Sequence, residues 1–158
     1  NQCIKKNIPY MFDPGFILTQ VNDSDLAKGV SHAKYIIGND YEINLMQHRI
    51  KNWDKILKSR VIIKTLGSKG SIVYDHGEKI KILPVEVKKP IDPTGAGDAW
   101  RAGFIAGLER NFDIKTSAQM GSVAAAYAVE TYGTQEHSYS LEEFNNRYRH
   151  TYKNLLDL

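Results

Sequence analysis

The sequence predicts an α/β protein in which helices are layered on a sheet, and three observations support this class. Short apolar runs alternate with helical patterns between residues 8 and 66, which is typical of layered α/β folds. Two glycine-containing turns, at residues 67–70 and 75–78, then predict a local antiparallel set of strands. After Pro93 the character changes: residues 95–131 carry two helical patterns rich in small residues, and residues 141–155 carry a final amphipathic one.

The individual elements follow from periodicity, capping residues and turn residues. The expected strands, in chain order, are residues 8–12, 35–38, 61–66, 71–74 and 79–87. The expected helices are residues 23–34, 40–57, 95–110, 115–131 and 141–155. Asn22 or Asp23 is a suitable cap for the first helix, and the second helix is expected to break near Asn52.

Composition and charge bound the function. The chain has 158 residues, 42% of them apolar and 25% charged, which suits one globular domain. Its net charge of +3 comes from 21 basic and 18 acidic side chains. The densest basic stretch, residues 79–89, alternates with apolar residues, so we expect a solvated strand edge and no nucleic-acid partner. A single cysteine excludes an internal disulfide and fits a cytoplasmic protein, and no apolar run is long enough for a membrane span.

The segment from Asp92 to Phe104 carries the strongest chemical signal, where a strand region gives way to a helix. We expect Thr94 to cap that helix and Gly95, Ala96 and Gly97 to form its first turn. The first amides of a helix have no intrahelical partner, and the helix dipole adds partial positive charge there. Without bulky side chains, this turn predicts a site for an anion such as a phosphoryl group.

Asp98 follows that turn directly and is the expected catalytic base. A carboxylate at a helix N-terminus stays ionised, so it could accept a proton from a substrate hydroxyl placed beside the phosphoryl group. The alternative is a glycine-capped helix in which Asp98 is only a first-turn acid. A dinucleotide fingerprint is excluded because Trp100 stands where the third glycine would be, and no Walker A pattern is present.

The run Asp92-Pro93-Thr94-Gly95-Ala96-Gly97-Asp98, followed by Ala102-Gly103-Phe104, resembles the C-terminal signature of the PfkB carbohydrate kinases, which include ribokinase, fructokinases and adenosine kinase. The resemblance implies a three-layer α/β/α ribokinase-like fold, ATP and Mg²⁺ as cofactors, and a sugar or nucleoside as substrate. It implies Asp98 as base and the backbone of residues 95–97 as an anion hole. Asp92 and Thr94 match positions that help bind a monovalent cation, such as K⁺, in several members.

Two further motifs match the same family. Asn39 and Glu42 resemble its Asn-x-x-Glu element, which supports the Mg²⁺–phosphate network through water. The two residues share a helix face, and an ordinary capping box is the alternative interpretation. Thr65, Gly67 and Gly70 resemble the Thr-x-Gly-x-x-Gly turn that contacts nucleotide phosphates and ribose, and a simple glycine-requiring hairpin fits as well.

Three other features carry weaker signals. Gly133 falls where the family has a glycine-containing loop bordering the adenine pocket and the cation, but Glu136-His137-Ser138 follows in place of the usual proline, which puts the cation site in doubt. Asp13-Pro14-Gly15 and Arg101 favour nucleoside-kinase-like relatives, and a turn after a strand is the alternative for the first. Lys64 is a strand lysine that could reach phosphate.

The resemblance covers nearly the whole chain but only the later part of the family's fold. Residues 1–158 are therefore expected to be the nucleotide-binding portion, without the substrate and lid part. The first hypothesis is a kinase that phosphorylates a primary alcohol and is nearly inactive as this isolated piece. The second is a non-catalytic nucleotide-binding module. The third is an oligomer scaffold built on an exposed sheet edge or helix face.

Overall fold

The computed structural model describes residues 2–156, so that residues 1, 157 and 158 lie outside the description. The chain divides into two compact units, Asn1–Lys81 and Ile82–Leu158. Each unit has its own hydrophobic core. None of the helices among the described residues is long and apolar enough to cross a membrane.

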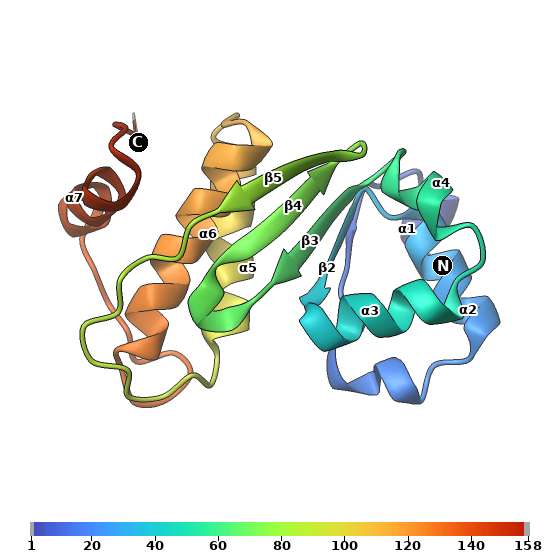
Figure 1. The fold of residues 1–158 in the computed structure, drawn as a ribbon, viewed down its shortest axis with the longest axis horizontal. Helices are drawn as coiled ribbons and strands as arrows, with labels where there is room; N and C mark the ends of the chain where they lie inside the picture. The colour runs from blue at the N-terminus through green and yellow to red at the C-terminus, as the bar shows by residue number, and fades with distance from the viewer. Residues whose placement is uncertain (1, 157–158) are drawn as a thin grey trace. The chain divides into compact units, whose positions relative to one another are not determined.

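The first unit is built on a mixed sheet with short helices around it (Figure 1). The strands follow the order β1-β2-β3-β4-β5, with β1 to β3 parallel and β4 antiparallel to β3. The strands are β1 (Met11–Phe12), β2 (Tyr35–Asn39), β3 (Val61–Thr65), β4 (Ser71–Asp75) and β5 (Glu78–Ile82). The helices are α1 (Gln2–Lys5), α2 (Asp23–His32), α3 (Asp40–Arg49) and α4 (Trp53–Leu57), with 3-10 turns η1 (Gly15–Thr19) and η2 (Gly67–Lys69).

Register within the parallel strands places two predicted site residues at one end of the sheet. β2 pairs with β3 from Tyr35 opposite Val61 to Asn39 opposite Thr65. Ile36, Ile37, Ile62 and Ile63 are buried, as expected for strands covered on both faces. The carboxyl ends of parallel strands are where α/β proteins bind ligands, and Asn39 and Thr65 occupy these ends.

The second unit is helical and consists of α5 (Ala96–Glu109), α6 (Ile114–Val129) and α7 (Leu141–Tyr152), preceded by an irregular segment over residues 83–93 (Figure 1). α5 and α6 pack backbone to backbone. A Cβ atom added at Gly103 would lie 2.8 Å from the Met120 carbonyl oxygen, and one added at Gly121 would lie 2.7 Å from the Trp100 carbonyl oxygen. The core of this unit includes Val85, Val123, Phe144 and Tyr148.

Most expected elements exist, and the differences lie at their ends. The expected strand at residues 8–12 is only β1, because Pro9 has no amide hydrogen to donate to a ladder. The expected strand at residues 79–87 ends at Ile82, two residues before Pro84. The helix α1 was not expected. The break in the 40–57 helix is confirmed at Asn52, which has a φ of 61° between α3 and α4.

The side chain of Tyr152, at the end of α7, makes the stability of the second unit depend on pH in the alkaline range. Its hydroxyl donates to the Leu83 carbonyl oxygen at 2.8 Å, and burial raises its pKa to about 12. Because the unfolded side chain ionises near pH 10, the stabilisation is complete below pH 10 and is lost as the pH rises towards 12. We expect Tyr152→Phe to make the unfolding free energy less dependent on pH in this window, as checked by urea unfolding with Tyr41→Phe, an exposed tyrosine, as control. An unchanged pH dependence would contradict this origin.

Candidate active site

The candidate site begins at the N-terminus of α5, where a glycine ends the preceding segment. Gly95 is the N-cap residue and has a φ of 82°, a left-handed conformation that favours glycine. A Cβ atom at this position would lie 2.9 Å from the Thr134 carbonyl oxygen. The expectation that Thr94 caps this helix is therefore wrong, because the chain turns sharply at Gly95 and Thr94 lies outside the helix.

Three amides at this terminus make no hydrogen bond to protein within residues 2–156: those of Gly95, Gly97 and Asp98. The Ala96 amide differs, because it donates to the Pro93 carbonyl oxygen at 3.1 Å. The sequence predicts an anion hole made by residues 95–97, and the structure leaves amides 95, 97 and 98 unpaired instead. Unpaired helix amides together with the dipole favour an anion at this point.

The Asp98 carboxylate stands beside these amides and faces solvent. Its side chain is 87% exposed, so a substrate hydroxyl could reach it. Arg101, one turn further along α5, donates from Nη1 to Asp98 Oδ1 at 3.2 Å. The arrangement therefore combines unpaired amides, an accessible carboxylate and a guanidinium within two turns of one helix.

The Asp92 carboxylate holds the segment that leads into this turn through hydrogen bonds. Its Oδ1 accepts from the Thr94 amide at 2.9 Å and its Oδ2 from the Gly133 amide at 3.2 Å. Hydrogen bonds from the Thr94 side chain and backbone, and then from Gly133, hold the pKa of the Asp92 carboxyl below its usual value. Asp92, Thr94 and Gly133, three of the residues that the sequence predicts, thus meet in one hydrogen-bonded group.

The C-terminal end of α6 holds the same segment further upstream. The Val129 carbonyl oxygen accepts from the amides of Ile91 and Asp92 at 2.8 and 3.2 Å. Glu130 Oε1 accepts from the Lys88 amide at 2.9 Å. The backbone on the approach to the anion hole is therefore bonded to the end of a buried helix at several points.

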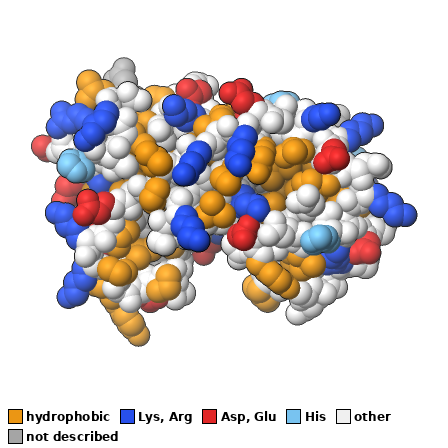
Figure 2. Space-filling view, viewed as in Figure 1, with side chains coloured by type: hydrophobic (Ala, Val, Ile, Leu, Met, Phe, Trp, Pro, Cys, Tyr) orange, Lys and Arg blue, Asp and Glu red, His pale blue; other side chains and the backbone are white. Residues whose placement is uncertain are grey.

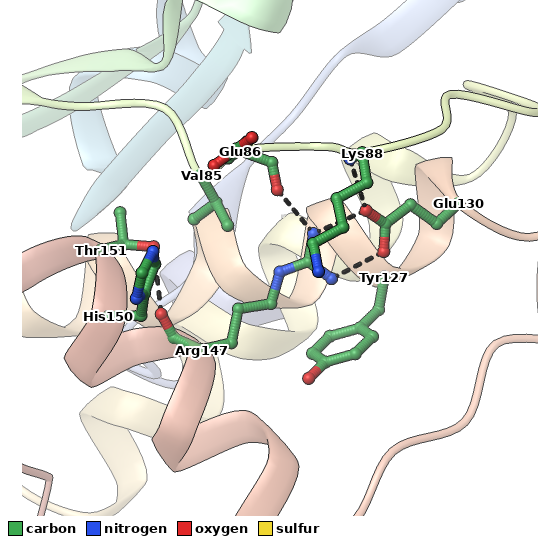
Figure 3. Close-up of a pocket in the computed structure, with 8 residues that line it drawn as sticks. All are labelled: Val85, Glu86, Lys88, Tyr127, Glu130, Arg147, His150 and Thr151. Atoms are coloured by element: carbon green, nitrogen blue, oxygen red, sulfur yellow. Dashed lines mark hydrogen bonds and ion pairs between the residues drawn. The ribbon is translucent and has the colours of Figure 1, made fainter.

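Arg147 of α7 completes this attachment (Figure 3). Its guanidinium donates to both carboxylate oxygens of Glu130, at 2.8 and 2.9 Å, and to the Glu86 carbonyl oxygen at 2.7 Å. It also lies over the Tyr127 ring, 4.5 Å from the ring centroid. These groups line a pocket of about 370 Å³. Because these contacts come from three parts of the chain, the Glu130–Arg147 pair joins the end of α6, helix α7 and the 83–93 segment.

Removing Arg147 should destabilise the second unit in a pH-dependent way. Arg147 lowers the pKa of Glu130, so the pair stabilises the fold above about pH 4.5 and the contribution is lost as the pH falls further. We expect Arg147→Met to lower the free energy of unfolding by about 1–3 kcal/mol at neutral pH, because the half-buried Glu130 loses a charged partner. The loss should shrink below pH 4.5.

Urea unfolding at several pH values measures this effect. Arg149→Met on the same helix is the matched control, since Arg149 is exposed and, within residues 2–156, its side chain bonds to Asn146 of its own helix. Equal losses in the two variants, or a loss at Arg147 that is independent of pH, would contradict the expected role of the pair.

In the first unit, Asn39 and Glu42 form a reciprocal capping box at the start of α3. Asn39 Oδ1 accepts from the Glu42 amide at 2.9 Å, and Glu42 Oε2 accepts from the Asn39 amide at 2.8 Å. The capping interpretation is therefore confirmed, and the role of both residues near Mg²⁺ stays a prediction. Lys64 is occupied by Asp40 Oδ1 at 2.7 Å and Asn44 Oδ1 at 2.9 Å, which argues against phosphate binding by its ammonium group.

Residues 67–69 of the glycine turn after β3 are exposed, whereas Gly70 is buried. Thr65 donates from its hydroxyl to the Gly38 carbonyl oxygen at 3.4 Å, which joins the ends of β3 and β2. Gly67 has a φ of 57° and Gly70 a φ of 85°, and an added Cβ atom at Gly67 would meet nothing within 4 Å. The exposed residues 67–69 are accessible to a ligand at the strand's carboxyl end. The hairpin interpretation also holds, because β3 and β4 are antiparallel neighbours.

On one face of the molecule, the basic side chains form no continuous patch. On the face drawn in Figure 2, Lys and Arg side chains are dispersed among hydrophobic and uncharged ones. Within residues 2–156, no group of three or more His, Cys, Asp and Glu side chains is placed to hold a metal ion. The candidate site is therefore best described by its amides and its individual side chains.

Comparison with known proteins decides the family. The model of the pfkB family carbohydrate kinases matches residues 1–140. The chain belongs to the pfkB family of carbohydrate kinases. It is 35% identical over 141 residues to a nucleoside kinase of Methanocaldococcus jannaschii, covering 85% of this chain and 46% of that protein. It is 37% identical over 128 residues to a nucleoside kinase of Methanothermobacter thermautotrophicus, covering 78% of this chain and 40% of that protein.

Solved structures of pfkB-family kinases match the fold. A nucleoside kinase of Burkholderia thailandensis in complex with inosine superposes with a TM-score of 0.93 at 28% identity, covering 98% of this chain and 53% of that one. The same kinase in complex with ADP-inosine superposes with a TM-score of 0.92, covering 98% of this chain and 49% of that one. The fold is thus ribokinase-like, on the nucleoside-kinase branch, and the chain spans about half the length of the curated relatives it matches.

Sequence reasoning missed two parts of this region. The Glu130–Arg147 pair joins the C-cap residue of α6 to a residue of α7 that is 17 positions away, and no local spacing marks such a contact. The close approach of Thr134 to Gly95 was missed as well, although the sequence predicts a functional loop at the neighbouring residue Gly133. The assignment of a phosphate turn to Thr65, Gly67 and Gly70 and of a base to Asp98 stays a prediction.

Proposed function

We propose that this chain is the nucleotide-binding and phosphoryl-transfer part of an ATP-dependent kinase whose acceptor is a primary alcohol of a nucleoside. The observation that carries the proposal is the trio of unpaired amides at Gly95, Gly97 and Asp98 beside the exposed Asp98 carboxylate. The similarity to nucleoside kinases supports the choice of acceptor, and the kinase complex with ADP-inosine supports ATP as donor.

The proposed step is an in-line transfer of the γ-phosphoryl group. The acceptor oxygen forms a bond to the γ-phosphorus while the bond from that phosphorus to the β–γ bridging oxygen breaks. The acceptor's proton passes to Asp98, and the bridging oxygen leaves on ADP with the electron pair. The protein contributes position and charge stabilisation, and the unpaired amides hold the migrating oxygens without any reorganisation during the step.

Other residues take supporting roles in this proposal. Thr65, Gly67 and Gly70 bind nucleotide, and Gly133 helps through its bond to Asp92. Asn39 and Glu42 supply oxygen atoms that would hold the hydration shell of Mg²⁺, and the ion would offset negative charge on the phosphates. Asp92 and Thr94 supply oxygen atoms that suit a monovalent cation such as K⁺, and the lowered pKa keeps the Asp92 carboxylate charged for it.

Two measurements test the proposal. The natural gene product that carries this chain should release ADP from ATP and Mg²⁺ in the presence of a nucleoside, and a free sugar should be a poorer acceptor. The isolated 158-residue chain should bind ATP in calorimetry but turn over almost none. Nucleotide binding without turnover in the natural gene product would support a binding module instead, and the absence of heat with ATP would contradict both functions.

A further inference from the structure

The Arg101 guanidinium lies in the first two turns of α5, where it contacts the Asp98 carboxylate. The Asp98 side chain is 87% exposed and that of Arg101 is 27% exposed. Ion pairs with so exposed a partner contribute little to stability. Arg101 is also the only Lys or Arg between Lys89 and Arg110, so the only formal positive charge on α5 lies within its first two turns.

Glycine at position 97 makes room for this guanidinium. A helical side chain runs back towards the N-terminus of its helix, and Arg101 lies one turn after Gly97. A Cβ atom on Gly97 would lie 2.8 Å from Arg101 Nη1, so the guanidinium would have to shift. The guanidinium therefore lies directly over the Gly97 backbone, whose amide is one of the three that make no bond to the described part of the chain.

A carboxylate base beside an anion hole creates an electrostatic conflict. The transferring phosphoryl group is negative, and so is Asp98, which must stand close to it to take the acceptor's proton. The amides offer only partial charges. A guanidinium is always charged and presents several donors in one plane, so a single group can contact a carboxylate and a phosphoryl oxygen together.

We propose that Arg101 is a further catalytic residue of this site, which binds a γ-phosphoryl oxygen during transfer while it also contacts Asp98. The inference rests on the proposed kinase function. Arg101 offsets the repulsion between the carboxylate and the phosphoryl group, and Gly97 serves both as an amide donor and as the space in which the guanidinium lies.

Variants in the natural gene product test this role through kinetics and binding. Arg101→Gln should lower kcat about 100-fold, since cations that stabilise the transferring group have effects of this order or larger. The dissociation constant of ATP should rise about 10-fold and that of ADP should stay unchanged, because ADP lacks the γ-phosphoryl group. Arg101→Lys, which keeps the charge and most of the stem, should lose about 10-fold in kcat.

A double-mutant cycle separates contact from general disturbance. Gly97→Ala should displace the guanidinium, so its effect on kcat should be much smaller in the Arg101→Gln background than in the wild type. Arg110→Gln, an exposed arginine just after the same helix, is the matched control and should leave kcat and both dissociation constants unchanged.

The outcomes are distinguishable from failure of the kinase proposal itself. Arg101→Gln with kcat within about 3-fold of wild type, or with ATP and ADP weakened equally, would overturn the role of Arg101. If Asp98→Asn is inactive while Arg101→Gln is active, only the Arg101 inference fails. If both variants retain activity, the Arg101 inference and the proposed kinase function both fail.

Discussion

Asp98→Asn is expected to lower kcat of the natural gene product about 1,000-fold while ATP affinity changes little. The substitution keeps the size of the side chain but replaces a carboxylate with an amide that is a far weaker base. Loss of a general base typically costs between 100- and 10,000-fold. The three unpaired amides remain, so nucleotide binding should survive. Steady-state kinetics with ATP and a nucleoside measures kcat, and calorimetry measures ATP affinity.

Glu109→Gln is the matched control for that variant. Glu109 is an exposed acid at the other end of α5, so the same chemical change is made far from the unpaired amides. The control should retain wild-type kcat. Asp98→Asn that keeps more than a tenth of wild-type kcat would rule out Asp98 as the base.

The largest effect on stability is expected from Gly103→Val, at the contact between α5 and α6. A Cβ atom there would lie 2.8 Å from the Met120 carbonyl oxygen and 2.9 Å from the Gly121 Cα atom. Backbone atoms of a buried helix cannot yield as a flexible side chain can, so the helices must separate. We expect the free energy of unfolding to fall by about 3 kcal/mol, which outweighs the small gain in helix propensity on replacing glycine.

Ala102→Val on the neighbouring residue is the control, because Ala102 is exposed. The same side chain then enters solvent, and the cost should be within about 0.5 kcal/mol. Urea unfolding of both variants measures the difference. Similar stabilities for the two variants would mean that α5 and α6 can move apart without cost.

Local signals in the sequence were sufficient where a short segment determines its own structure. Asn22 caps α2 as expected, and the buried isoleucines of β2 and β3 predict paired strands. The break at Asn52 was predictable because asparagine tolerates a left-handed conformation. These features depend on residues within one turn or one strand, so spacing alone reveals them.

Features that depend on distant partners could not be predicted in the same way. Thr94 is a good capping residue by type, but the N-cap is Gly95, where a Cβ atom would meet the distant residue Thr134. The bond from Ala96 to Pro93 depends on the turn that results. Similarly, the sequence predicts that Arg147 is a surface residue of an amphipathic helix. Its contact with Glu130 forms only when the chain folds.

The two left-handed glycines at positions 95 and 67 should respond differently when codons are randomised and functional clones are selected. At position 67 an added Cβ atom meets nothing within 4 Å, so asparagine and aspartate, which tolerate a positive φ, should be recovered beside glycine. At position 95 the Thr134 backbone blocks every larger residue, and sequencing of the survivors should return glycine alone. Recovery of asparagine at position 95 would mean that the loop around Thr134 can retreat.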